Sequence, residues 1–203
     1  TNLGVEGMML IGAVMGFVAA LNTENAIAAI LVAAVAGAGG ALIFAVLTVT
    51  LRANQIVCGL TLTIFGTGFA QFVGESMLGT SAPSQITEFF AKISIPLLGD
   101  VPFIGPIFFR QDMFVYLSYI LCALAAVYMY KTRMGMNLKA PGESNAAADA
   151  SGINVTLYKY VHILIGGALC GLGGAYLSLV RMPIWQENIV NGRGWIAVAL
   201  VIF

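Results

Sequence analysis

Long apolar segments alternate with short polar ones along most of the chain. Five of these segments are long enough to cross the hydrocarbon core of a bilayer, which takes about 20 residues of helix. They lie at Leu3–Leu21, Ala26–Leu51, Asn54–Gly74, Met113–Tyr130 and Tyr160–Val180. A sixth begins at Ile196 and continues to the last residue, Phe203. The pattern predicts an all-α integral membrane protein, built as a polytopic helical bundle.

The composition agrees with a membrane protein. Hydrophobic residues make up 60% of the chain and charged residues only 9%, whereas soluble domains carry about 25% charged residues. The net charge is zero, so the sequence gives no indication of nucleic-acid binding. With so many apolar residues, the chain is expected to be surrounded by membrane lipid. The three cysteines, Cys58, Cys122 and Cys170, are far apart in apolar runs, which is typical of small buried side chains. No metal and no cofactor is predicted.

Both ends of the chain look truncated. The sequence does not begin with Met, and the run that starts at Ile196 is far too short to cross a bilayer. We therefore expect a fragment of a longer protein, with residues 1–203 forming a single transmembrane domain.

The most polar stretch is the insert at residues 131–159, which lies between the fourth and fifth spans. Lys131, Arg133, Lys139 and Lys159 flank it or lie in it, which predicts a cytoplasmic location because cytoplasmic loops are enriched in basic residues. It also contains a short Ala-rich helical stretch, Glu143–Gly152, with an acidic start. We interpret this insert as a docking element for a soluble partner.

A second polar region, residues 75–112, falls on the extracytoplasmic side by alternation. Four prolines punctuate it. Phe89–Leu98 and Val101–Phe109 are apolar but too short to span, so they are predicted to lie in the membrane interface or to re-enter it.

Two stretches match without a gap, Ala34–Ala41 and Ala168–Ala175. After each come an Arg and an apolar segment that ends in Ile-Phe. The two copies would run in opposite directions through the membrane, which indicates an inverted repeat of the kind found in alternating-access transporters. The alternative is coincidence between two Gly/Ala-rich helices. In either case small residues four apart allow close helix packing, and the candidates are Gly37, Gly40, Gly171 and Gly174.

Polar groups within or beside the spans are candidates for function because they are costly in lipid. Glu6 is bracketed by glycines, and it either lines a cavity as part of a broken helix or is solvated among headgroups. Arg193 and Trp195 form a similar break, which could contact a ring or a hydroxylated ligand or serve as an interfacial anchor. Asn54 and Gln55 either cap the third span or line the path. The candidate path residues are Asn2, Glu6, Asn54, Gln55, Arg193 and Trp195.

Four stretches together resemble the permease subunits of bacterial ABC importers for nucleosides and simple sugars, in the wider ribose and branched-chain amino acid permease group. These stretches are Asn2–Ala13, Leu51–Leu60, Gly135–Glu143 with Ala147–Ile153, and Gly166–Leu179 with Gly192–Ala197. The resemblance covers nearly the whole chain. One departure lies after Gly142-Glu143, where this chain has Ser144, Asn145 and Ala146 in place of Asn-Pro and a polar or basic residue. Ser144 or Asn145 can still cap a helix there.

The resemblance implies a subunit that is not itself an enzyme. It would lie in the bacterial plasma (inner) membrane as a multi-pass protein. Its partners would be a second related permease, cytoplasmic ATP-binding subunits that hydrolyse ATP, and an extracytoplasmic substrate-binding lipoprotein. The coupling loop within residues 131–159 would contact the ATP-binding subunits through Gly142, Glu143, Ser144, Asn145, Ala147, Ala148, Asp149 and Gly152.

Two other functions fit the sequence less well. An ion-coupled secondary transporter of a small polar solute needs acidic residues at membrane depth, and Glu6 is the one acid that the pattern puts there. A structural scaffold fits the composition but gives the Ala-rich polar helix no role. By the resemblance, nucleosides are the first expectation for the substrate, followed by ribose-like sugars and riboflavin.

Overall fold

The structure is a computed structural model that describes residues 2–91, 93–94 and 109–202. The chain forms two compact units, one made of Thr1–Phe89 with Lys159–Phe203 and the other of Phe90–Tyr158.

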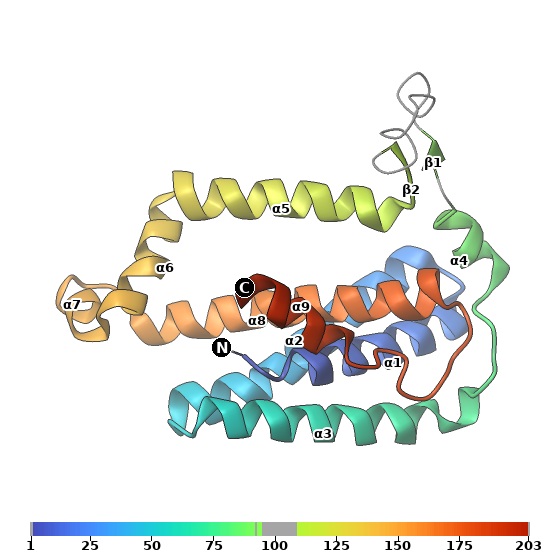
Figure 1. Cartoon of the computed structure of the whole chain (residues 1–203), viewed down its shortest axis with the longest axis horizontal. Coiled ribbons are helices and arrows are strands. Elements are labelled where there is room, and N and C mark those ends of the chain that lie inside the picture. The colour runs from blue at the N-terminus through green and yellow to red at the C-terminus, as the bar shows by residue number, and fades with distance from the viewer. Residues whose placement is uncertain (1, 92, 95–108, 203) are drawn as a thin grey trace. The chain divides into compact units, whose positions relative to one another are not determined.

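The larger unit is helical (Figure 1). Its described elements are α1 (Val5–Thr23), α2 (Ala26–Ala45) with a π-helical turn at Val46–Thr50, α3 (Gln55–Gly74) with a 3-10 turn at Glu75–Met77, α4 (Ser84–Phe89), α8 (Val155–Tyr176) with a π-helical turn at Leu177–Arg181, and α9 (Arg193–Ile202). The first residues of α8 belong to the smaller unit.

The smaller unit contains α5 (Met113–Lys131), α6 (Arg133–Glu143) and α7 (Asn145–Ala150). A short antiparallel pair precedes them, formed by β1 (Ile93–Ser94) and β2 (Arg110–Gln111). Thr132 forms the corner between α5 and α6, where its hydroxyl accepts a hydrogen bond from the Gly135 amide at 3.1 Å and donates one to the Tyr128 carbonyl at 2.7 Å. This capping turns the chain sharply from a span into the polar helix α6.

The prediction of an all-α membrane protein with five spans is confirmed. Within the described residues, five helices are long and apolar enough to cross a membrane: Val5–Thr23, Ala26–Thr50, Gln55–Met77, Met113–Lys131 and Val155–Arg181. The fifth begins five residues before the predicted Tyr160. Its start is set by Asn154, whose side chain accepts the Leu157 amide at 3.0 Å, because a cap decides where a helix begins even where hydropathy is low.

The polar regions contain more helix than the sequence predicted. The insert holds α6 as well as the expected Ala-rich helix, which is α7. The region 75–112 includes α4 and the β1–β2 pair, which were not predicted. Most of the two proposed interfacial segments, Phe89–Leu98 and Val101–Phe109, lies outside the described residues.

Helix α1 is the centre of the larger unit. Of the α1 span, 61% is buried, against 28–39% of the spans that contain α2, α3 and α8. Three glycines on α1 each face a different neighbour: Gly7 meets α3, Gly12 meets α8 and Gly16 meets α2. Close approach at small residues is how helices associate where lipid supplies no hydrophobic drive.

The two matching stretches contact each other at equivalent positions. A Cβ on Gly37 of α2 would lie 2.7 Å from the Gly171 Cα of α8, and one on Gly171 would meet the Ala33 carbonyl. Reciprocally, a Cβ on Gly37 would meet the Gly167 carbonyl. Ala33 precedes Gly37 by the same four residues as Gly167 precedes Gly171, and the helices run antiparallel. Reciprocal contacts of this kind are what a two-fold axis between the copies produces.

The other two packing candidates face α1. A Cβ on Gly40 would lie 3.1 Å from the Ile11 side chain, and one on Gly174 would meet the Met9 carbonyl. All four candidate packing glycines therefore lie against a neighbouring helix. Both repeat helices also end in a π-helical turn of five residues, a feature that is frequent at functional sites.

Candidate functional site

After the second π-helical turn the chain turns back along α1 instead of continuing as helix (Figure 1). We call residues 182–192 the re-entrant segment. Near its start, Trp185 packs on Phe17 with ring centroids 5.5 Å apart. At its end, Gly192 reaches Glu6. Phe17 and Glu6 are eleven residues apart on α1, which corresponds to about 17 Å of helix rise, so α9 begins well inside the unit.

The start of the re-entrant segment is held by backbone pairing with residues 79–82. The Trp185 amide donates to the Thr80 carbonyl at 2.9 Å, and the Gly79 amide donates to the Trp185 carbonyl at 3.0 Å. Trp185 is 3% exposed, and its indole lies where a side chain on Gly74 of α3 would stand. The aromatic ring therefore closes the space between α1 and α3 at this end.

Glu6 caps the start of α9. Its two carboxylate oxygens accept the Gly192 amide at 2.7 Å and the Gly194 amide at 2.8 Å. The first amides of a helix lack partners within it, and a negative charge there is favourable. A Cβ on Gly194 would come 2.6 Å from a Glu6 oxygen, so glycine is required for this approach.

This arrangement gives Glu6 a structural role that the sequence did not predict. The residue is 5% exposed, so it is not solvated among headgroups. It stands in the first turn of α1, which continues without a break to Thr23, so the broken element is the one before α9. From the opposite helix, Glu6 stabilises the broken element, and its place as a path residue stays a prediction.

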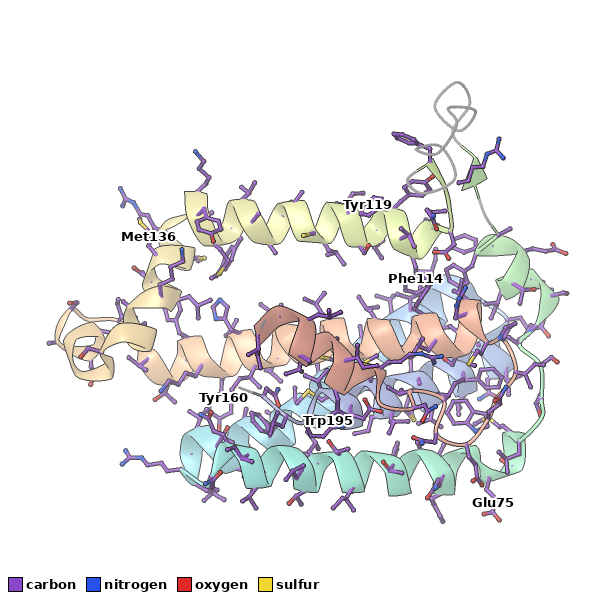
Figure 2. The ribbon with its side chains drawn as sticks, in the orientation of Figure 1. Glu75, Phe114, Tyr119, Met136, Tyr160 and Trp195 are labelled. Carbon is purple, nitrogen blue, oxygen red and sulfur yellow. The ribbon has the colours of Figure 1, made fainter. Side chains whose placement is uncertain are left out.

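Arg193 and Trp195 lie at the beginning of α9, which starts three residues before the predicted Ile196. The Arg193 guanidinium donates to the Ile189 carbonyl at 3.1 Å and lies 4.0 Å from the Met182 sulfur. It thus holds the re-entrant segment from its far end. Trp195 is half-buried on α9 (Figure 2).

Of the three remaining path candidates, Asn2 and Asn54 stabilise helix starts through their side chains. The Asn2 side chain accepts the Gly4 amide at 2.9 Å before α1. The exposed Asn54 accepts the Ile56 amide at 2.9 Å and caps α3, of which Gln55 is the first residue. Of the two roles considered for Asn54, capping the third span and lining the path, the structure shows the cap.

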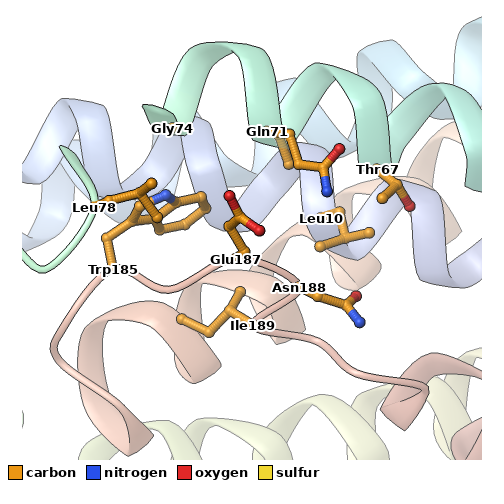
Figure 3. Close-up of a pocket in the computed structure, with 10 residues that line it drawn as sticks. Leu10, Thr67, Gln71, Gly74, Leu78, Trp185, Glu187, Asn188 and Ile189 are labelled. Carbon is orange, nitrogen blue, oxygen red and sulfur yellow. The ribbon is translucent and has the colours of Figure 1, made fainter. Parts of the chain in front are cut away.

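The re-entrant segment lines two spaces. The first, which we call the polar hollow, has about 220 Å³ and is lined by Met182, Gln186, Glu187, Asn188, Ile189, Asn191 and Arg193. The second, which we call the narrow cleft, lies between α1, α3 and the segment and is lined by residues that include Leu10, Thr67, Gln71 and Trp185 (Figure 3). The cleft has about 10 Å³, room for roughly one water molecule.

The sequence prediction included Arg193 but missed the other polar residues of the hollow. Their signal was present, since Gln186-Glu187-Asn188 and Asn191 follow a proline between two apolar segments. Asn188 and Asn191 have φ of 53° and 44°, a left-handed conformation in which Asn is enriched. These residues bend the segment around the hollow.

The Ala-rich insert has its own compact geometry in the smaller unit. The Ala148 amide donates to the Ser144 carbonyl at 3.1 Å, and Ala148 is 3% exposed. Asp149 is exposed, and Gly152 ends the turn with a φ of 78°. Gly142 is also exposed, whereas the side chains of Glu143, Asn145 and Ala147 lie outside the described part of the chain.

Among the described residues, no three His, Cys, Asp or Glu side chains converge as a metal site. The site consists of a broken helix, its carboxylate cap and a polar hollow.

Comparison with known proteins identifies the family of the chain. The family model described as "Branched-chain amino acid transport system / permease component" matches residues 1–203. The chain belongs to this permease family.

The family and the five span-length helices make this permease a multi-pass protein of the plasma membrane. It is 36% identical to a putative glucose ABC transporter permease protein of Haloferax volcanii, over all of this chain and 61% of that protein. It is 34% identical to a guanosine ABC transporter permease protein of Bacillus subtilis and 34% identical to a nucleoside ABC transporter permease protein of Lactococcus lactis, in each case over all of this chain and 66% of the relative.

The chain thus spans about two thirds or less of the length of these curated relatives. No solved structure matches this permease. Members of the family are permease subunits, which are not themselves enzymes.

Proposed function

We propose that the protein is the membrane-spanning subunit of an ATP-driven (ABC) importer that moves nucleosides or simple sugars into the cytoplasm. The match of the permease family to all 203 residues carries this proposal. The relatives are named as permeases for glucose, guanosine and nucleosides, which supports the substrate class.

The charges at the two ends of the larger unit support an orientation. The Thr50 and Tyr160 hydroxyls are hydrogen-bonded, so the end of α2 and the start of α8 meet, and Arg52 and Lys159 lie close by in sequence. The other end carries Glu24, Glu75 and Arg181. Because basic residues are enriched in cytoplasmic loops, we assign the end with Arg52 and Lys159 to the cytoplasm. The re-entrant segment then enters from the outside.

The reciprocal contact of α2 and α8 supports a mechanism. Two copies related by a pseudo-two-fold axis can rock against each other, which exposes a central path to one side and then to the other. We propose that the ATP-binding subunits, the substrate-binding lipoprotein and a second related permease are the partners in this cycle. Residues 142–152 would transmit the closure of the ATP-binding subunits, with ATP hydrolysed on those subunits.

The secondary-transporter alternative receives less support. It needs a carboxylate at depth that is free to exchange an ion or a proton with the path. Glu6 is buried, but both of its oxygens accept backbone amides at the start of α9. Its geometry favours a fixed structural role.

A charge reversal on α7 tests the coupling role. Asp149 is exposed on α7, so Asp149→Lys should change the docking surface without disturbing the fold. We expect solute uptake by the reconstituted full-length complex to fall at least tenfold, while the amount of protein in the membrane is unchanged. ATP hydrolysis by the complex should no longer respond to solute.

Thr156→Lys is the matched control, because it adds the same side chain at an exposed position just beyond the proposed coupling residues. It should retain most of the uptake. Wild-type uptake by the Asp149→Lys complex would exclude α7 as the coupling element.

A further inference from the structure

We infer that the polar hollow binds the hydroxylated part of a neutral solute as the solute enters from the outside. This inference rests on the proposed transport of nucleosides or sugars, and it assigns the recognition to residues 186–193 of this chain. The argument has three steps, which concern the position of the hollow, its chemistry and its inner wall.

The position of the hollow requires water or protein around it. The re-entrant segment is non-helical between Trp185 and Gly192 and runs beside about 17 Å of α1. Non-helical backbone at membrane depth is tolerated only where it is buried in protein or lines a water-filled cavity. Gln186, Glu187 and Asn188 are exposed, so this stretch is not buried in protein. It therefore lines a water-filled cavity, and the hollow is that cavity.

The chemistry of the hollow favours a neutral polyol. Gln186, Asn188 and Asn191 offer amide donors and acceptors, while Glu187 and Arg193 carry opposite charges. The Gly192 and Gly194 amides at the start of α9 already bind Glu6, so the helix terminus does not provide an anion site. Paired donors and acceptors without net charge match sugar hydroxyls.

The size of the hollow limits what it can hold. Its volume of about 220 Å³ is below the roughly 300–1,000 Å³ of pockets for drug-sized ligands. A monosaccharide, or the ribose of a nucleoside whose base projects outward, therefore suits it better than a larger solute. Both occupants present the same chemistry, a sugar ring with several hydroxyl groups.

The inner wall of the hollow separates it from the narrow cleft. Glu187, Asn188 and Ile189 line both spaces, and Figure 3 shows their side chains beside Trp185 and the α1 and α3 residues. Because the cleft has room for about one water, a solute held in the hollow does not continue into the space between α1 and α3. The hollow is therefore closed on this side.

The test uses thiol labelling of the full-length protein in membranes without ATP, after replacement of Cys58, Cys122 and Cys170 by alanine. Gln186→Cys probes the hollow and Thr67→Cys probes the cleft, and a charged, membrane-impermeant thiosulfonate reagent is the label. Val35→Cys, which is 72% exposed on α2 and lines neither space, is the lipid-facing control. We expect Gln186→Cys to react at least tenfold faster than Thr67→Cys and Val35→Cys.

Solutes at saturating concentration then identify the occupant. Ribose or glucose represents the free sugar, uridine and guanosine carry ribose on a base, uracil is a base without a sugar, and glycine controls for osmolarity. We expect the sugars, the nucleosides or both to slow the labelling of Gln186→Cys at least fivefold, and uracil and glycine to have no effect. In the same background, Glu187→Gln should raise the solute concentration needed for half-protection, whereas Glu75→Gln should not.

Equal labelling with and without every sugar and nucleoside would overturn the inference, as would equal protection by uracil. Labelling of Thr67→Cys as fast as Gln186→Cys would overturn the closed inner wall. These results do not depend on ATP or on partner subunits. Failure of ATP-driven uptake with intact protection would instead count against the importer.

Discussion

Gly171→Leu is expected to lower the stability of the protein strongly, whereas Gly166→Leu, five residues earlier on the same helix, is expected to leave it unchanged. A Cβ on Gly171 would meet the Ala33 carbonyl and would lie 3.1 Å from the Gly37 Cα. These are backbone atoms of α2, so α2 and α8 would have to separate. A Cβ on Gly166 has no described atom within 4 Å.

Overpacking of a well-packed core costs about 1–3 kcal/mol and occasionally more. At Gly171 we expect a loss of stability at the upper end of this range or above it. The new side chain would meet backbone atoms of α2, which cannot rotate away, and α1 also approaches there through Gly12. Thermal unfolding of the purified full-length protein, followed by size-exclusion chromatography, measures the effect. Gly37→Leu and Gly39→Leu form a second matched pair on α2, since Gly39 is open. Unchanged stability of Gly171→Leu would show that the two repeats do not meet at this position.

Glu6→Ala is expected to produce the second large effect, a loss of stability together with release of α9. Removal of the carboxylate leaves the Gly192 and Gly194 amides without their acceptors, and each unsatisfied buried group costs about 1–3 kcal/mol. Glu6→Gln keeps one acceptor oxygen but turns an NH₂ group toward the other amide, so an intermediate loss is expected. The order of unfolding temperatures should be wild type, then Glu6→Gln, then Glu6→Ala.

Glu75→Ala is the control, because it removes the same carboxylate from an exposed position. It should leave the unfolding temperature within one or two degrees, since surface substitutions usually change stability by less than about 0.5 kcal/mol. If Glu6→Ala and Glu75→Ala had equal effects, the Glu6 cap would not hold α9.

Hydropathy predicted the spans because lipid requires long apolar helices with their backbone groups satisfied internally. The repeat was also visible, since the close approach of α2 and α8 needs glycine at Gly37 and Gly171, and the matching stretches preserve that spacing. The start of α8 at Val155 was not predicted, because it depends on one side-chain cap from Asn154, and hydropathy does not register caps.

The role of Glu6 could not be predicted from local sequence. Its partners, Gly192 and Gly194, lie more than 180 residues away, and the sequence gives no measure of that proximity. The role of Gly194 could not be predicted either. A glycine before an apolar run is typical of many helix breaks, and only the fold shows that this one makes room for the Glu6 carboxylate. The polar residues of the hollow are visible in the sequence, where they are typical of an ordinary connection between spans. Only the structure shows that this connection runs back along α1.

ATP-driven uptake by a reconstituted complex tests the central proposal most directly. The full-length protein, purified together with its ATP-binding subunits and second permease, would be placed in proteoliposomes with the substrate-binding protein outside and ATP inside. Labelled uridine, guanosine, ribose and glucose would be offered separately.

We predict uptake of at least one of these solutes that requires hydrolysable ATP, stops with a non-hydrolysable analogue and persists when ionophores collapse the ion gradients. Uptake by the permease alone that needs no ATP and is driven by an ion gradient would contradict the importer and favour a secondary transporter.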